Sequence, residues 1–126
     1  MKNLLIVAFG GALGALARYG LSSWTQTRIQ GAFPWGTLVV NATGCLAIGV
    51  LWHLVEDKGT VGPAGRLLIA TGILGAFTTF SAFGLETVVL IQTRQFAWAL
   101  GNVAGNVILG FGFVWLGRAA PTLLGL

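Results

Sequence analysis

The sequence predicts an all-α integral membrane protein with four transmembrane helices. Hydrophobic residues make up 56% of the 126-residue chain and charged residues only 8%, whereas about a quarter of the residues in a soluble domain are charged. The apolar residues form four segments, each close to the roughly 20 residues that a helix needs to cross a bilayer. These segments run from about 4 to 24, 35 to 55, 67 to 91 and 96 to 116. Because the connections are short, we expect a single transmembrane domain, 1–126, and no enzyme.

The first segment resembles a signal sequence, with Ala15-Leu16-Ala17 as a possible cleavage site. Its apolar character continues beyond that site, so we expect it to be retained as a helix. Tryptophan placement supports the four-span assignment, because this ring is enriched at the headgroup level. All five tryptophans lie near expected helix ends: Trp24, Trp35, Trp52, Trp98 and Trp115.

The third segment contains a stretch, residues 71–83, that weakens a helix at its centre. Gly72 and Gly75 raise the backbone entropy lost on helix formation. The adjacent Thr78 and Thr79 restrict χ1 and offer hydroxyls to backbone groups. We therefore predict that the third helix is broken at mid-membrane. Irregular backbone at that depth persists only where protein buries it or where it lines a wet cavity, so the break is a candidate ion site.

The basic residues show almost no bias between the two sides of the membrane. Four lie on the side of the termini and three on the other: Lys2, Lys58, Arg66 and Arg118 against Arg18, Arg28 and Arg94. Because Lys and Arg near helix ends set orientation, this balance predicts insertion in both orientations and an antiparallel, dual-topology homodimer. The same scattering excludes the basic stripe that nucleic-acid binding requires.

Small residues on three segments predict close helix packing, and hence a dimer whose conduit lies between subunits, since four tightly packed helices cannot enclose a pore. They are Gly10, Gly11 and Gly14, then Ala42, Gly44 and Gly49, then Gly101 and Gly105. The single cysteine, Cys45, excludes an internal disulfide, and we expect it to be a packing residue.

Polar residues inside the spans are functional hypotheses, because each is costly in hydrocarbon unless it is paired or wet. The neutral ones are Thr37, Asn41, Thr43, Thr78, Thr79, Ser81, Asn102 and Asn106. Interhelical hydrogen bonds are the alternative role for each. The Asn41 amide can donate to an anion. Arg18 either snorkels to the interface or draws anions into a vestibule, and Glu86 either lines a water-filled entrance or takes part in proton chemistry.

Phe80 and Phe83 lie three residues apart, on one helix face just after the predicted break. Such a pair usually packs in a core, but the positive edges of the rings can also stabilise a dehydrated anion weakly, as conduction requires. With Asn41 they would form a multi-site anion path. The break itself offers carbonyl oxygens, and two copies could direct these at a small cation such as Na⁺; threonine hydroxyls stitching the break are the alternative.

Three motifs together identify a resemblance: Gly10-Gly11-x-x-Gly14-x-x-x-Arg18-Tyr19, Gly36-Thr37-Leu38-x-Val40-Asn41-x-x-Gly44, and Gly72-x-x-Gly75-x-x-Thr78-Thr79-Phe80-Ser81-x-Phe83. The chain closely resembles the Fluc fluoride channels, also called CrcB proteins, over all four segments. This resemblance implies a passive, fluoride-selective channel that exports fluoride across the bacterial inner membrane. It also implies an antiparallel homodimer with two pores and a structural Na⁺ at its centre.

The resemblance assigns roles to individual residues. It makes Phe80 and Phe83 the aromatic pair of the pore and Asn41 its amide donor, while the carbonyls of Gly75 and Thr78 would hold Na⁺. Thr37 and Glu86 would lie near the pore ends and Arg18 in the vestibule. Ala82 and Gly110 stand where family members often carry hydroxyls, so the polar track beside the rings would depend on Thr79, Ser81 and Asn106.

Two other functions compete with this one. A small multidrug exporter also has four short helices, but it needs a carboxylate, typically in the first helix, and the first segment here has none. A structural or accessory membrane subunit would use its polar residues only to join helices. The predicted break in the third segment argues against that second function.

Overall fold

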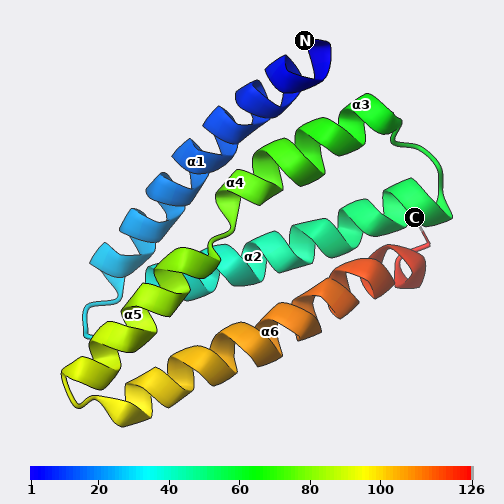
Figure 1. Ribbon diagram of the computed structural model, residues 1–126. Helices are drawn as coiled ribbons and strands as arrows, with labels where there is room; N and C mark the ends of the chain where they lie inside the picture. The colour runs from blue at the N-terminus through cyan, green and yellow to red at the C-terminus, as the bar shows by residue number, and fades with distance from the viewer. Residues whose placement is uncertain (126) are drawn as a thin grey trace.

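The computed structural model describes residues 1–125, and every regular element among them is helical. Four helical units are long and apolar enough to cross a membrane: Lys2–Arg28, Trp35–Asp57, Pro63–Gln92 and Phe96–Leu123. The all-α class and the four membrane-length helices are therefore confirmed. The units run alternately up and down, and the two termini lie toward the same end of the molecule (Figure 1).

The first two units are helix α1 (Lys2–Arg28) and helix α2 (Trp35–Trp52), which continues as one π-helical turn, η1 (His53–Asp57). Gln26 fixes the connection between them. Its Nε2 donates to the carbonyl of Phe33 at 3.2 Å, and its Oε1 accepts from the N–H of Gly36 at 3.2 Å. One amide thus joins the last turn of α1 to the first turn of α2.

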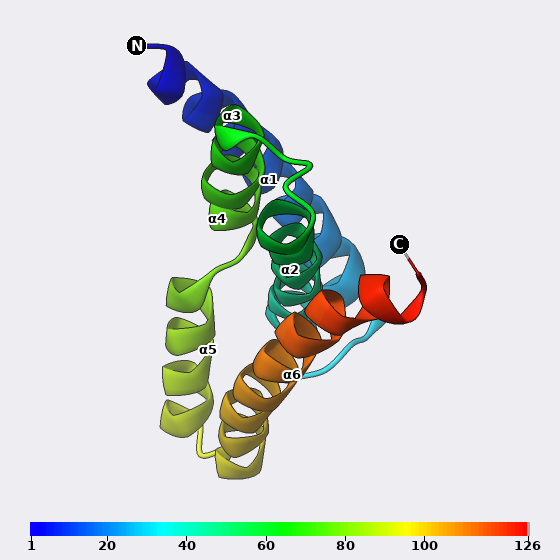
Figure 2. The same ribbon diagram turned by 90° about the vertical axis from the view of Figure 1, so that its right-hand side faces the viewer.

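The third unit consists of several pieces. It begins with α3 (Pro63–Arg66), η2 (Leu67–Leu74) and α4 (Gly75–Phe77). Thr78 and Thr79 then adopt extended backbone conformations, with ψ values of 155° and 118°. Helix α5 (Phe80–Gln92) follows, displaced sideways from α4 (Figure 2). The helical path is thus interrupted at two residues, both within the stretch 71–83.

The fourth unit is α6 (Phe96–Leu123), joined to α5 by a tight turn at residues 93–95 in which Arg94 has a φ of +59°. Helix α6 runs well past the expected end at 116, and α1 runs past 24 to Arg28. The expected ends marked where apolar residues stop, whereas backbone hydrogen bonding continues through the polar residues beyond. Pro121 lies in the last turns of α6 without ending it.

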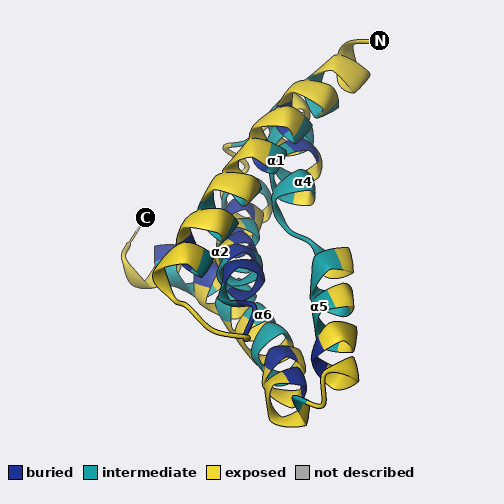
Figure 3. Cartoon of the chain, turned by 90° about the vertical axis from the view of Figure 1, so that its left-hand side faces the viewer, coloured by how far each residue is buried: buried dark blue, intermediate teal, exposed yellow. Residues whose placement is uncertain are grey.

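Helix α2 is the centre of the packing, in contact with α1, α6 and both halves of the third unit. The buried residues of the chain gather along it, while the outer faces of α1, α5 and α6 are exposed (Figure 3). Two glycines permit the closest approaches. A Cβ at Gly14 of α1 would overlap the carbonyl of Ile73, and one at Gly117 of α6 would overlap that of Leu46. Gly101 and Gly105 face only the side chains of Phe33 and Leu38.

We predict that Gly14→Ala destabilises the protein, because the new methyl group forces α1 away from the Ile73 carbonyl. Overpacking of this kind costs about 1–3 kcal/mol. The thermal midpoint in detergent should fall for this variant. Gly20→Ala is the matched control on the same helix, since open space surrounds Gly20, and it should leave the midpoint equal or higher. Equal losses in the two variants would contradict the prediction.

Candidate functional site

Asn41 of α2 binds the interrupted backbone directly. Its Nδ2 donates to the carbonyl of Thr79 at 3.1 Å, and its Oδ1 accepts from the N–H of the same residue at 2.9 Å. Its second amide hydrogen is directed to Oδ1 of Asn106 on α6, at 2.9 Å. A side-chain amide therefore supplies Thr79 with the donor and the acceptor that a continuous helix would have supplied. Because both amide hydrogens are engaged, donation to an anion requires Asn41 to exchange one of these bonds.

The same arrangement deprives several backbone carbonyls at and before the interruption of their helical partners, among them those of Gly75 and Thr78. In an uninterrupted helix, the N–H of Thr79 would bond the carbonyl of Gly75, and that of Ala82 would bond the carbonyl of Thr78. Here the Thr79 N–H donates to Asn41, and the Ala82 N–H donates to Oγ1 of Thr79 at 3.2 Å. The carbonyl oxygens of Gly75 and Thr78 thus lose their helical partners. Unwound carbonyls are suitable ligands for Na⁺, so these two residues fit the predicted ion.

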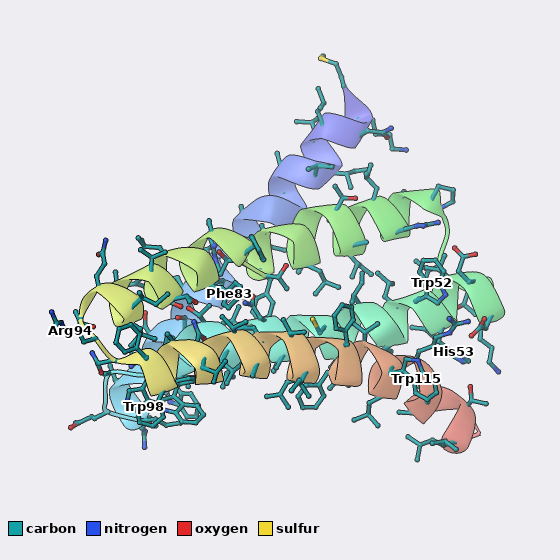
Figure 4. All side chains as sticks on the ribbon, turned by 60° about the horizontal axis from the view of Figure 1, so that its bottom comes forward. Trp52, His53, Phe83, Arg94, Trp98 and Trp115 are labelled. Carbon is teal, nitrogen blue, oxygen red and sulfur yellow. The ribbon has the colours of Figure 1, made fainter. Side chains whose placement is uncertain are left out.

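Phe80 and Phe83 lie on the first turn of α5, directly after the interruption. Their ring centroids are 5.4 Å apart and the rings are tilted by 57°. Phe80 is 83% exposed, whereas Phe83 is half-buried and lies on the side of α5 that faces α2 and α6 (Figure 4). Both rings line a cavity of about 510 Å³, whose wall also includes Asn41, Asn106, Gly110 and Phe111. The structure therefore brings the predicted aromatic pair and the predicted amides to one cavity.

The polar groups beside the rings are few. The hydroxyls of Thr79 and Ser81 lie 3.3 Å apart at the start of α5. A Cβ at Gly110 would lie 3.6 Å from Sγ of Cys45, so the Cys45 thiol adjoins the place where a side chain at 110 would be. Cys45 also lines the cavity. Sequence reasoning assigned this cysteine to packing alone, because its apolar neighbours gave no signal that it reached a cavity.

A second cavity, of about 280 Å³, lies between α1, α2 and α5. It holds Arg18, Thr37 and Glu86, the residues predicted for the vestibule and the pore ends. Oγ1 of Thr37 donates to Oε1 of Glu86 at 2.6 Å, while Oε2 of Glu86 is buried without a hydrogen-bond partner among the described residues. Thr79 lines both cavities, so the interruption of the third unit borders each of them.

Asn102 and Asn106 make the interhelical bonds that were the alternative role for them. Nδ2 of Asn102 donates to Oγ1 of Thr87 on α5 at 3.0 Å, and Oδ1 of Asn106 accepts from Asn41 on α2 at 2.9 Å. Within α6, Nδ2 of Asn106 donates to Oδ1 of Asn102 at 3.0 Å. Sequence reasoning did not single out Thr87. In an apolar helix a lone threonine usually bonds its own backbone, and the hydroxyl of Thr87 does donate to the carbonyl of Phe83 at 2.8 Å.

His53 lies away from both cavities, near Trp52 and Trp115 (Figure 4). It is buried, and its Nδ1 lies 2.9 Å from Oδ2 of Asp57. Among residues 1–125, no three His, Cys, Asp or Glu side chains group together as metal ligands.

Comparison with known proteins decides the family. A profile described as "CrcB-like protein, Camphor Resistance (CrcB)" matches residues 5–118. The chain belongs to the CrcB-like family. Three relatives carry the name fluoride-specific ion channel FluC. One from Nitratidesulfovibrio vulgaris (strain Miyazaki F) is 43% identical over 98% of this chain and 100% of its own length. One from Desulforapulum autotrophicum is 44% identical over 97% and 98%. One from Thermus thermophilus is 43% identical over 99% and 98%.

These matches confirm the resemblance that the motifs indicated. Members of this CrcB-like family are ion channels, so the chain is not an enzyme. Together with the four membrane-length helices, they identify a multi-pass membrane protein.

Proposed function

We propose that the protein is a passive, fluoride-selective channel that exports fluoride from the cytoplasm across the bacterial inner membrane. The observation that carries this proposal is the joining of Phe80, Phe83 and the Asn41–Asn106 pair in one cavity. The names of the relatives supply the anion. Hydrogen fluoride enters cells as a neutral acid and dissociates in a less acidic cytoplasm, so an open anion path releases fluoride down its gradient without an energy source.

The path would stabilise the anion through several weak contacts. Ring edges carry partial positive charge, and the Phe80 and Phe83 rings, with centroids 5.4 Å apart, could each turn an edge toward the anion. The Thr79 and Ser81 hydroxyls and the Asn106 amide lie beside them. Asn41 would reach the anion by exchanging one of its two donor bonds. Thr37 and Glu86 would then lie toward a pore end and Arg18 in a vestibule that attracts anions.

A second copy of the chain would complete the conduit. The cavity beside Phe80 is open in a single chain, and Phe80 and Phe111 are 83% and 76% exposed. A polar, aromatic groove open to lipid would offer an ion no enclosed path. The balance of basic residues favours an opposed copy, which gives an antiparallel, dual-topology homodimer. Each copy carries one such groove, so the dimer would contain two pores.

A structural sodium ion would lie where the two interruptions meet. The released carbonyls of Gly75 and Thr78 are the ligands that each copy would contribute. When bound, Na⁺ would satisfy the carbonyls electrostatically and join the subunits. The support for this site is the capture of the Thr79 and Ala82 N–H groups by side chains.

We predict that the purified chain alone releases fluoride from loaded liposomes and that Phe80→Ile slows this release about tenfold, the equivalent of about 1.4 kcal/mol of lost aromatic stabilisation. A fluoride electrode measures the efflux, and chloride-loaded liposomes measure selectivity. Phe96→Ile is the control, since Phe96 is 62% exposed at the start of α6 and does not line the cavity. Equal chloride release, or an unchanged rate in Phe80→Ile, would contradict the proposal.

Dual topology predicts that one position is reached from both sides of the membrane. Thr60, in the exposed connection between η1 and α3, can be changed to Cys in a Cys45→Ala background. A membrane-impermeant maleimide should label about half of the chains in intact cells and the rest only after permeabilisation, because near-zero charge bias gives both orientations. Complete labelling, or none, before permeabilisation would show a single orientation.

The sodium site predicts that fluoride release depends on Na⁺. Protein dialysed into N-methylglucamine buffer should lose efflux, and restored Na⁺ should recover it, because unpartnered carbonyls at the subunit interface are costly without a cation. The fluoride electrode follows both steps. Efflux that is the same with and without Na⁺ would refute a required ion.

A further inference from the structure

Four side-chain hydrogen bonds form one continuous relay from α2 through α6 to α5. Asn41 donates to Asn106, Asn106 to Asn102, Asn102 to Thr87, and Thr87 to the carbonyl of Phe83, at 2.9, 3.0, 3.0 and 2.8 Å. Every bond points in the same direction along the relay. Both ends hold the start of α5, since Asn41 also binds the backbone of Thr79.

Main-chain groups determine the direction of the relay at both of its ends. Because the Thr87 hydroxyl gives its only hydrogen to Phe83, its oxygen can only accept, and Asn102 must present an N–H to it. The Oδ1 of Asn102 then faces the Nδ2 of Asn106, which donates both to it and to the main-chain carbonyl of Asn102, each at 3.0 Å.

This requirement passes on to Asn41. The Oδ1 of Asn106 is left facing Asn41, which must direct an N–H toward it. The Thr79 main chain sets the same orientation from the other side, because its N–H can only donate to the Oδ1 of Asn41 and its carbonyl can only accept from the Nδ2. One amide orientation at each asparagine satisfies the whole relay.

Asn102 is the central member and is fully buried, with an exposed fraction of 0%. Neither it nor Thr87 lines the 510 Å³ cavity. If the Asn102 amide were reversed, its nitrogen would face the Asn106 nitrogen and its oxygen would face the Thr87 hydroxyl oxygen, which can only accept. The free-energy cost of such buried, unsatisfied groups is larger than the contribution of a hydrogen bond. Burial therefore makes Asn102 the least adjustable member.

We propose that Asn102 is a positioning residue for conduction: through Asn106 it holds the Asn41 amide against the Thr79 backbone, and through Thr87 it holds Phe83, so that rings and amide keep a fixed relation at the cavity. The inference rests on the proposed function, because its consequence is the rate at which fluoride passes the cavity. Its structural part, the support that Asn102 gives to the Asn41–Thr79 junction, can be measured without any transport.

The test compares Asn102→Leu and Thr87→Val with Thr87→Ser, which keeps the hydroxyl. Thr43→Val is the control, since the Thr43 hydroxyl bonds only carbonyls of its own helix, those of Val39 and Val40. Each protein is reconstituted at no more than one channel per vesicle. The fraction of vesicles that empties then reports folded protein, and the rate in those vesicles reports conduction.

We expect Asn102→Leu and Thr87→Val to slow fluoride release per active vesicle about tenfold, the effect of about one charge-free hydrogen bond lost from the path. Thr87→Ser and Thr43→Val should match the parent. The double variant Asn102→Leu/Thr87→Val should be no slower than either single variant, because the residues act as one unit. A lower fraction of active vesicles with an unchanged rate would reduce Asn102 to a folding role and overturn the proposal.

Amide hydrogen exchange separates this inference from the proposed function. Asn102→Leu should raise exchange about tenfold in peptides that contain Thr79 and leave peptides from α1 unchanged. If the parent releases no fluoride but this local increase is found, the proposed function fails and the positioning effect of Asn102 stands. Unchanged exchange at Thr79 overturns the inference, whatever the parent transports.

Discussion

The bonding of one backbone unit, that of Thr79, is the constraint on which the rest of the site depends. In an apolar surrounding an unpaired N–H or carbonyl costs several kcal/mol. Asn41 supplies both partners from a neighbouring helix. Helix α5 can therefore begin anew at Phe80, displaced from α4, with the rings of both Phe80 and Phe83 lining the cavity. The released carbonyls at Gly75 and Thr78 are a consequence of the same exchange of partners.

Much of the fold could be predicted from the sequence because hydropathy and helix propensity, which determine it, are local properties. The four spans follow from hydropathy over about 20 residues, and the interruption at Thr78 and Thr79 falls where glycines and β-branched residues weaken a helix. The helix ends could not be predicted as well. Arg28 and Leu123 lie beyond the apolar segments, where intrahelical hydrogen bonds extend the helices without help from hydropathy.

The sequence predicted which residues form the site better than it predicted the hydrogen bonds between them. The expected residues other than Ser81 do gather at two cavities, because motifs on successive spans meet when the spans pack antiparallel. Which atoms bond depends on how α2, α5 and α6 are rotated about their axes, and sequence spacing does not contain that information. Both amide hydrogens of Asn41 are accordingly donated to protein groups, and Thr87 belongs to a hydrogen-bond network that no motif indicated. The assignment of individual residues to anion or sodium remains a prediction.

The pairing of Asn41 with Thr79 also limits how the sequence can change. Where a contact joins two side chains, loss at one position can be offset by a substitution at the other. At Thr79 the bonded atoms belong to the main chain, which every residue except proline shares. No replacement at 79 can therefore compensate for a replacement at 41. Position 41 alone therefore supplies the side chain that keeps this junction bonded. A second-site change that restores the junction must introduce a new amide or hydroxyl elsewhere on α2 or α6.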